Sequence, residues 1–299
     1  MDGLVSVNGK VSPPEDACLP ALDRGFLFGD NVFEVFVAFG QRIIEAERHL
    51  QRLKESASRM GFGIPWSGDE LLFEMEALLQ TTNYPKSYLR LVITRGSGLG
   101  LQVGDHLRSN RVIYCFPAPL VSNRIYQQGM TLKRKTLPFT ERGATAKTGN
   151  YLRSINALAK ATEEGFDDIL WSNSNEEITE ASAANIFLIG RQGDLVEIAT
   201  PPASSGLLLG ITRAKIIELL QMSQIPVTER VIYFDELASF DEAFLCSTVK
   251  GILPVTKIDQ HKLHTLRQNA VFHHIDRLYS TWIESQLGYR VEWNTGAVI

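Results

Sequence analysis

The stretch "ATAKTGNYLRSINALAKATEEGF", residues 144–166, joins a turn of small residues to a clear helical pattern. Apolar residues recur at helical spacing from Tyr151 onward, and Gly165 stands where a helix C-terminus favours a residue that tolerates positive φ. Lys147 lies in the turn immediately before this helix. Such a lysine is either a solvated charge, which the helix dipole opposes, or a side chain aimed into a pocket. The rest of the chain decides between these two interpretations.

The composition is that of an ordinary globular protein. The chain has 299 residues, of which 44% are hydrophobic and 21% charged, enough for a sizeable core and about two domains. The net charge is −4 and the basic residues are dispersed, which favours neither nucleic acid nor an anionic membrane as a partner. The three cysteines are far apart and outside any CxxC spacing, which argues against a disulfide framework or a zinc site. With no signal-peptide pattern and no membrane-length apolar run, we expect a cytoplasmic protein.

Hydrophobic periodicity predicts a mixture of strands and helices along the chain. An Asn-Gly pair between alternating apolar residues in "LVSVNGKV" predicts a hairpin near the start. The segment "FPAPLVSN", with two prolines and no periodicity, indicates a linker between domains. We therefore expect an α+β protein with a small N-terminal domain at 1–117, a linker at 118–123 and a larger C-terminal domain at 124–299. Further helices are expected at about 212–223 and 264–287.

Two conspicuous motifs do not predict a site by themselves. "RGSGLGLQVG" resembles a glycine-rich nucleotide loop, but no helical pattern follows it, as a Rossmann or P-loop phosphate site requires. We interpret it as a flexible loop after a strand, with residues 99–107 as a candidate substrate-facing segment. The histidines of "HKLHT" and "FHH" lack a carboxylate or cysteine at ligand spacing, so we expect no metal site. No GxSxG elbow or local cysteine signature indicates a serine or cysteine nucleophile.

Four other segments have functional interpretations, although each has an ordinary structural one as well. In "LLLGITRAKIIELL", Ile211 and Thr212 begin an amphipathic helix whose first N–H groups can bind phosphate. The other three are a hydroxyl turn in "LCSTVKGILPV", a carboxylate before an apolar strand in "EITEASAANIFLI", and two arginines four residues apart on one helix face in "ERHLQRL". Together with a lysine, these are the groups that pyridoxal phosphate requires: a Schiff base, phosphate anchors and a partner for the pyridinium nitrogen.

In its order of segments, the chain resembles the fold-type IV family of pyridoxal-phosphate enzymes. This family includes branched-chain aminotransferases, D-amino acid aminotransferases and aminodeoxychorismate lyases. The matching segments are "DRGFLFGDNVFE", "ERHLQRL", "YLRLVITRG", "AKTGNYL", "EITEASAANIFLI", "LLGITR" and "STVKGILPV", which together extend over nearly the whole chain. The resemblance implies a two-domain α+β fold like that of D-amino acid aminotransferase, with pyridoxal 5'-phosphate in the interdomain cleft. It also implies a homodimer in which a loop of the partner's small domain closes each site.

The resemblance assigns roles to individual residues. Lys147 forms the Schiff base with the cofactor and then moves a proton between the substrate α-carbon and the cofactor. Glu180 contacts the ring nitrogen, and Tyr151 binds the phenolic oxygen. The implied phosphate ligands are Arg48, Ile211, Thr212 and Thr248. The substrate residues expected are Phe33, Val37, Arg90, Val249 and Lys250, with the loop at 250–252.

The branch of the family follows from details of the same motifs. "YLRLVITRGSGLGL" and "KTGNYL" resemble the branched-chain enzymes, whereas "VFEVFVAFG" is similar to the D-amino acid branch at Glu34 and Val35. Both branches usually carry a basic residue at the position of Val37. We expect amino transfer from a branched-chain or other hydrophobic L-amino acid to a 2-oxo acid. The alternatives are a D-amino acid aminotransferase, an aminodeoxychorismate lyase, an (R)-amine transaminase, and an inactive relative, which the presence of Lys147 and Glu180 disfavours.

Overall fold

The computed structural model describes residues 2–104, 107–138, 145–192 and 195–298, and the chain forms two compact units. Unit 1 comprises Met1–Leu120, Ala146–Tyr151 and Gln286–Ile299, and unit 2 comprises Val121–Thr145 and Leu152–Ser285. The change of unit after Leu120 falls within the expected linker. The units nevertheless differ from the two contiguous domains expected from sequence, because the segment with Lys147 and the C-terminal segment both belong to unit 1.

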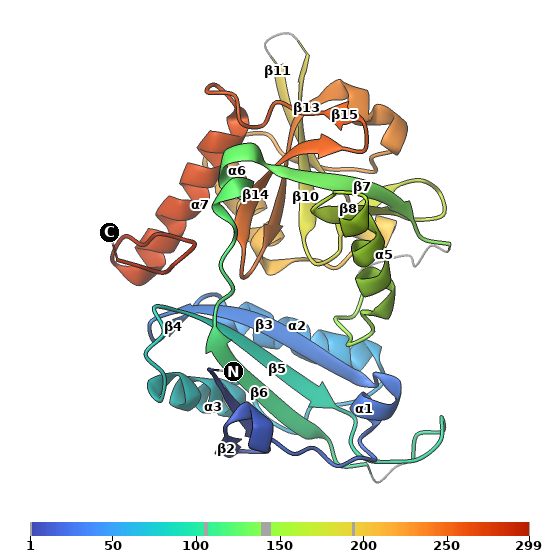
Figure 1. The fold of residues 1–299 in the computed structure, drawn as a ribbon, viewed down its shortest axis with the longest axis vertical. Coiled ribbons are helices and arrows are strands. Elements are labelled where there is room, and N and C mark those ends of the chain that lie inside the picture. The colour runs from blue at the N-terminus through green and yellow to red at the C-terminus, as the bar shows by residue number, and fades with distance from the viewer. Residues whose placement is uncertain (1, 105–106, 139–144, 193–194, 299) are drawn as a thin grey trace. The chain divides into compact units, whose positions relative to one another are not determined.

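Unit 1 contains a six-stranded antiparallel sheet in the order β2-β1-β6-β5-β3-β4 (Figure 1). The strands are β1 (Leu4–Val7), β2 (Lys10–Ser12), β3 (Asn31–Phe39), β4 (Arg42–Ile43), β5 (Lys86–Thr94) and β6 (Asn110–Pro117). The predicted hairpin of β1 and β2 turns at Asn8 and Gly9, which both have positive φ. An Asn-Gly pair favours such a turn because both residues tolerate this conformation.

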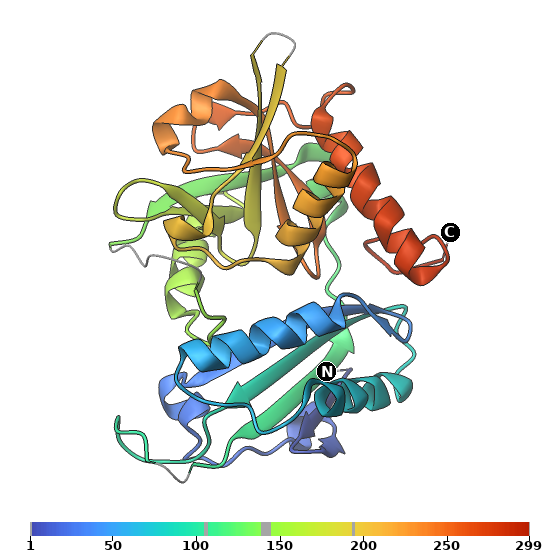
Figure 2. The same ribbon diagram turned by 180° about the vertical axis from the view of Figure 1, so that it is seen from behind.

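Helices α2 (Ala46–Arg59) and α3 (Gly68–Gln80) cover one face of this sheet, as Figure 2 shows. The Ser67 hydroxyl and the Glu70 carboxylate form a capping box that begins α3. Val32, Phe36 and Ala38 of β3 pack into the core beneath the helices. Because side chains alternate along a strand, Glu34 lies on this same helix-covered face.

The C-terminal segment packs on the edge of unit 1 through one lysine. Lys86 is buried, and its Nζ donates a hydrogen bond to the backbone oxygen of Trp293 at 2.7 Å. The Trp293 and Phe39 rings lie 5.3 Å apart, and the ammonium group lies over both rings. These contacts explain why residues at the end of the chain belong to the unit formed by its beginning.

Unit 2 contains a nine-stranded mixed sheet in the order β12-β11-β10-β13-β14-β7-β8-β9, with β15 beside β14. A bridge between Glu180 and Asn185 also joins β9 to β10. The strands are β7 (Met130–Thr136), β8 (Asp168–Ser172), β9 (Ile178–Ala181), β10 (Asn185–Gln192), β11 (Leu195–Thr200), β12 (Thr228–Glu229), β13 (Phe240–Ser247), β14 (Gly251–Ile258) and β15 (His261–Lys262). The helices are α4 (Asn123–Gln128), α5 (Leu152–Glu163), α6 (Ile211–Met222) and α7 (Val271–Leu287).

Three elements differ from the sequence prediction. Helix α7 begins at Val271 rather than near residue 264, because the Glu242 carboxylate accepts the N–H groups of Val271 and Phe272 and caps the helix there. Helix α4 begins at Asn123, inside the expected linker, and α1 (Arg24–Phe28) was not predicted at all. Both are too short to show a helical period. No helix in the described part of the chain is long and apolar enough to span a membrane.

Candidate active site

The turn that carries Lys147 is held by two elements of unit 1. The Phe33 N–H of β3 donates to the Lys147 carbonyl at 3.0 Å, and the Lys147 N–H donates to the Ser56 hydroxyl of α2 at 3.1 Å. Thr148 also forms a bridge with Val32. A side chain at Gly149 would clash with Asn31, so the small residues of the motif let the turn approach β3 closely. Lys147 is therefore fixed against a sheet and a helix, not placed on a loose surface turn.

The aromatic ring of Phe33 brings three of the predicted site residues together. The Lys147 Nζ lies 4.7 Å from the ring centroid, and the Arg90 guanidinium carbon lies 3.7 Å from it. The Tyr151 ring centroid is 5.7 Å away. An aromatic face attracts cations, so Phe33 stabilises both basic groups at this position. Val37 lies on the same face of β3 as Phe33 and pairs with Tyr88 of the neighbouring strand.

A charged cluster lies behind this lysine, between β3 and α2. The Glu34 side chain is fully buried, and both its oxygens accept from Arg52, Oε1 from Nε at 2.6 Å and Oε2 from Nη2 at 2.9 Å. His49 Nδ1 lies 2.7 Å from Glu34 Oε2. Burial raises the pKa of Glu34, but the charge of Arg52 and the hydrogen bonds from His49 and Arg52 outweigh it and hold that pKa at about 2. Glu34 is therefore ionised at neutral pH and accepts hydrogen bonds only.

Arg48 and Arg52 of α2 have different surroundings. Arg48 pairs with Glu45 at 2.9 Å and its side chain is 41% exposed, whereas that of Arg52 is 12% exposed. Ser56, which holds the Lys147 backbone, follows Arg52 by one helical turn and lies on the same face. Sequence reasoning selected Arg48 and missed Glu34 and His49. A single carboxylate within the apolar run "VFEVFV" was the available signal.

In unit 2, the Glu180 carboxylate lies at the end of β9 in a defined orientation. Its Oε2 accepts from the Asn185 amide and from the Leu208 backbone N–H, both at 3.3 Å. The same amide nitrogen of Asn185 donates to the Leu208 carbonyl at 2.9 Å. Asn185 therefore connects the predicted ring-nitrogen ligand with the segment that leads into α6. Glu180 is half-buried, as a carboxylate facing a ligand needs to be.

Helix α6 begins at the predicted phosphate-binding residues. Gly210 is its N-cap, and within the described residues no side chain caps the helix. A side chain at Gly210 would clash with Asn185, so the start of α6 packs directly beside the Glu180 carboxylate. Thr212 is buried at the first turn and Ile211 is half-buried. Backbone N–H groups and the helix dipole make such a start a binding site for an anion.

The hydroxyl turn between β13 and β14 is the third predicted cofactor-binding segment of unit 2. Thr248 and Val249 are half-buried and Lys250 is exposed. A small pocket beside this turn is lined by Lys250 and by Asp168, which sequence reasoning missed. Burial raises the pKa of Asp168, although backbone N–H donors from Ile169 and Ser182 and the nearby charge of Lys250 oppose the effect.

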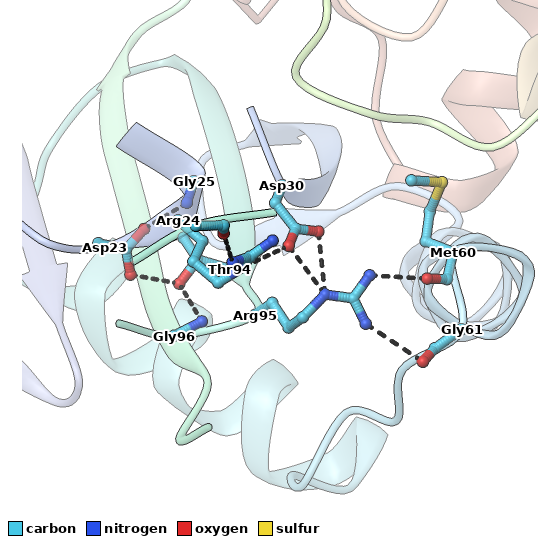
Figure 3. Close-up of polar contacts among 10 residues, drawn as sticks. Asp23, Arg24, Gly25, Asp30, Met60, Gly61, Thr94, Arg95 and Gly96 are labelled. Atoms are coloured by element: carbon cyan, nitrogen blue, oxygen red, sulfur yellow. Dashed lines mark hydrogen bonds and ion pairs between the residues drawn. The ribbon is translucent and has the colours of Figure 1, made fainter. Parts of the chain in front are cut away.

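The glycine-rich loop after β5 is anchored by a second ion-pair network in unit 1 (Figure 3). Asp30 accepts from Arg24 Nε at 2.8 Å and from Arg95 Nε at 2.9 Å, and Arg95 also donates to the carbonyls of Met60 and Gly61. Arg24 Nη1 donates to the Gly100 carbonyl at 2.7 Å. The base of the predicted substrate loop is therefore fixed, and residues 105–106 of that loop lie outside the described residues.

These groups fit the chemistry of a phosphorylated aldehyde with a basic ring nitrogen. Described separately, unit 1 has an amine beside aromatic rings, and unit 2 has a carboxylate next to an uncapped helix start. Among the described residues, no group of three or more His, Cys, Asp or Glu is arranged to hold a metal ion.

Known proteins match both the sequence and the fold. A model of the amino-transferase class IV family matches residues 31–258. A putative branched-chain-amino-acid aminotransferase of Methanocaldococcus jannaschii is 30% identical over 85% of this chain and 88% of that protein. A D-alanine aminotransferase of Listeria monocytogenes is also 30% identical, over 85% of this chain and 87% of that protein. The sequence is thus equally similar to relatives named for two different substrates.

Solved structures extend the match to the fold. The branched-chain amino acid aminotransferase of Escherichia coli has a TM-score of 0.82 at 26% identity and covers 93% of both chains. The 4-amino-4-deoxychorismate lyase of Pseudomonas aeruginosa has a TM-score of 0.78 at 26% identity and covers 96% of this chain and all of that one. These matches confirm the expected α+β fold, the enzyme class and, through the family, the pyridoxal phosphate cofactor. The chain belongs to the class IV aminotransferases, pyridoxal-phosphate-dependent enzymes of fold type IV.

Proposed function

We propose that this protein moves an amino group from a branched-chain or other hydrophobic L-amino acid to a 2-oxo acid. The observation that carries this proposal is the stacking of Arg90 on Phe33, the ring that also holds Lys147. One cation near the lysine can bind one substrate carboxylate. The neighbouring Val37 is buried and apolar, so this position adds no second cation for an acidic substrate side chain.

The residues of each unit have distinct tasks in this proposal. When bound, pyridoxal phosphate supplies an electrophilic carbon and a ring that accepts electrons. The Lys147 amine holds the cofactor and then takes the proton from the substrate α-carbon. Glu180 holds a proton at the ring nitrogen, and Tyr151 donates to the phenolic oxygen. Ile211, Thr212 and Thr248 bind the phosphate.

For the basic phosphate ligand on α2 we propose Arg52 in preference to Arg48. Arg52 is the less exposed of the two and lies one helical turn nearer to Ser56, which binds the Lys147 turn. The test compares Arg52→Met with Arg48→Met by titration with pyridoxal phosphate and with pyridoxal, which lacks the phosphate. We expect Arg52→Met to lose most of the preference for the phosphorylated form. The same loss in Arg48→Met alone would restore the original assignment.

We also propose that the working unit is a homodimer. Unit 1 exposes large apolar side chains on α1 and on the glycine-rich loop after β5, with Phe26 76%, Leu99 75% and Leu101 82% exposed. These segments lie side by side, because the Gly98 N–H donates to the Leu22 carbonyl. The exposed apolar side chains of these segments suit a second copy of this chain. Sedimentation of Phe26→Ser/Leu101→Ser should show monomer, while Phe73→Ser, which removes an equally exposed ring from α3, should leave the dimer intact.

The substrate is tested by single half-reactions on the purified yellow protein. L-leucine, D-alanine, (R)-1-phenylethylamine and 4-amino-4-deoxychorismate are added separately, and loss of the cofactor absorbance is followed. We expect bleaching by L-leucine. Bleaching by D-alanine or the amine alone would move the function to those branches, and pyruvate release from the chorismate would identify a lyase. A protein that takes up no pyridoxal phosphate would remove the proposal altogether.

A further inference from the structure

We propose that Glu34 and His49 are positioning residues that orient the Arg52 guanidinium and offset its charge beside Lys147. The inference rests on the proposed function, in which Lys147 and Arg52 both serve the cofactor. Glu34 and His49 need not touch the cofactor or the substrate themselves, since their effect passes through Arg52.

The geometry of the Glu34 carboxylate supports the orienting role. Both carboxylate oxygens accept from Arg52, at 2.6 Å and 2.9 Å, so the pair is bidentate and fixes the plane of the guanidinium. The His49 Nδ1 at 2.7 Å and the Val35 N–H at 3.3 Å complete the shell around Oε2. With Glu34 fully buried, these donors replace water entirely.

The protonation states follow from the same contacts. Ionised Glu34 can only accept, so His49 must carry its hydrogen on Nδ1. Burial lowers the pKa of His49; the Arg52 and Lys147 charges lower it too, and together they outweigh the opposing effect of Glu34. His49 is therefore neutral near pH 7, and the charge of Glu34 balances that of Arg52. Lys147 is the remaining charged group that acts on the histidine.

The cluster also joins the two elements that hold Lys147. Glu34 of β3 pairs with Arg52 of α2, and the neighbouring residues Phe33 and Ser56 bind the Lys147 backbone from the same two elements. A substitution at Glu34 can therefore affect the surroundings of Lys147 in two ways. Shortening the carboxylate disturbs orientation while keeping the charge, and neutralising it leaves the Arg52 charge unbalanced.

Two variants of the holoenzyme separate these effects. Glu34→Asp tests orientation. We expect this variant to lose about tenfold more affinity for pyridoxal phosphate than for pyridoxal, because the charge-assisted hydrogen bonds to Arg52 are distorted. Glu34→Gln tests charge, and we expect the pH midpoint of the bound cofactor's absorbance change to fall by about one unit. The midpoint falls because loss of a negative charge disfavours the protonated form.

The matched controls are Glu74→Asp and Glu74→Gln. Glu74 also pairs with an arginine, Arg111, and with Ser6 in unit 1, but it is not part of the Lys147 cluster. We expect neither control to change the phosphate preference or the midpoint. The inference would be overturned if Glu34→Asp lost affinity equally for pyridoxal phosphate and for pyridoxal. It would also be overturned if Glu34→Gln left the pH midpoint of the absorbance change where it is in the wild type.

A second pair of variants keeps the test decisive if the Glu34 variants do not fold. His49→Asn retains an N–H donor near the position of Nδ1, whereas His49→Phe removes it. We expect His49→Asn to preserve the preference for pyridoxal phosphate over pyridoxal, and we expect His49→Phe to reduce this preference. Equal behaviour of the two would also overturn the inference. A wild-type protein without bound cofactor would instead contradict the proposed function.

Discussion

The two units present different kinds of binding chemistry. Unit 1 uses charged side chains, with Lys147 over an aromatic ring and Arg52 paired to a buried carboxylate. In the proposed site, unit 2 would use mainly backbone N–H groups at the start of α6, together with the oriented carboxylate of Glu180. A charge in a poorly solvated place depends strongly on each partner, whereas an anion shared among several backbone donors depends little on any one side chain. Unit 1 should therefore be the more sensitive to single substitutions.

The largest effect is expected at Lys147. Lys147→Ala removes the only amine proposed to hold the cofactor and to move the proton, so kcat should fall by about 10³-fold. The protein should also lose the absorbance of the covalently held cofactor. Lys160→Ala, at an exposed lysine of α5, is the control and should behave as wild type. Normal absorbance in Lys147→Ala would contradict the assignment.

Glu180 tests whether unit 2 contributes more than phosphate binding. Glu180→Gln keeps the size of the side chain but cannot hold a proton at the ring nitrogen, so kcat should fall about a hundredfold. Pyridoxal phosphate affinity should change little, because the phosphate donors remain. Glu176→Gln, at an exposed carboxylate paired with Arg134, serves as the control. A change in affinity without a change in kcat would make Glu180 a purely structural residue.

The pH dependence of the free energy of unfolding tests the buried Glu34–Arg52 pair of unit 1. The pKa of Glu34 is about 2 in the folded protein against 4.5 for an ordinary glutamate. A lowered folded pKa adds stability that is complete above pH 4.5 and is lost as the pH falls toward 2. The linkage relation gives about 3 kcal/mol in total. Urea unfolding at pH 6, 4.5 and 3.5 should show a flatter pH dependence for Glu34→Gln, and parallel curves for the two proteins would contradict the prediction.

The smallest effect is expected at Thr212. Thr212→Val removes one hydroxyl but leaves the N–H groups of α6, so pyridoxal phosphate affinity should fall no more than about tenfold. Fluorescence titration beside the exposed control Thr228→Val measures this change. A loss above a hundredfold would show that unit 2 also relies on a single side chain, and the difference between the units would disappear.

Sequence patterns predicted the features that depend on neighbouring residues. The Asn-Gly hairpin and the start of α6 at Ile211 are local, because backbone geometry and nearby hydrogen bonds decide them. Lys147 stood out for a similar reason, since a lysine in a small-residue turn before a helix is visible within a few residues. The order of the motifs along the chain was enough to indicate the family.

Only the tertiary structure decided which charged groups meet. Arg48 and Arg52 lie four residues apart on one helix face, and spacing alone does not distinguish them. Burial against β3 does, through the Glu34 carboxylate, which lies 18 residues from Arg52 in sequence. The Lys147 turn likewise belongs to unit 1 because it bonds to Ser56, 91 residues away. The sequence by itself determined local structure and chemical type, whereas desolvation and pairing depend on long-range packing that no local pattern contains.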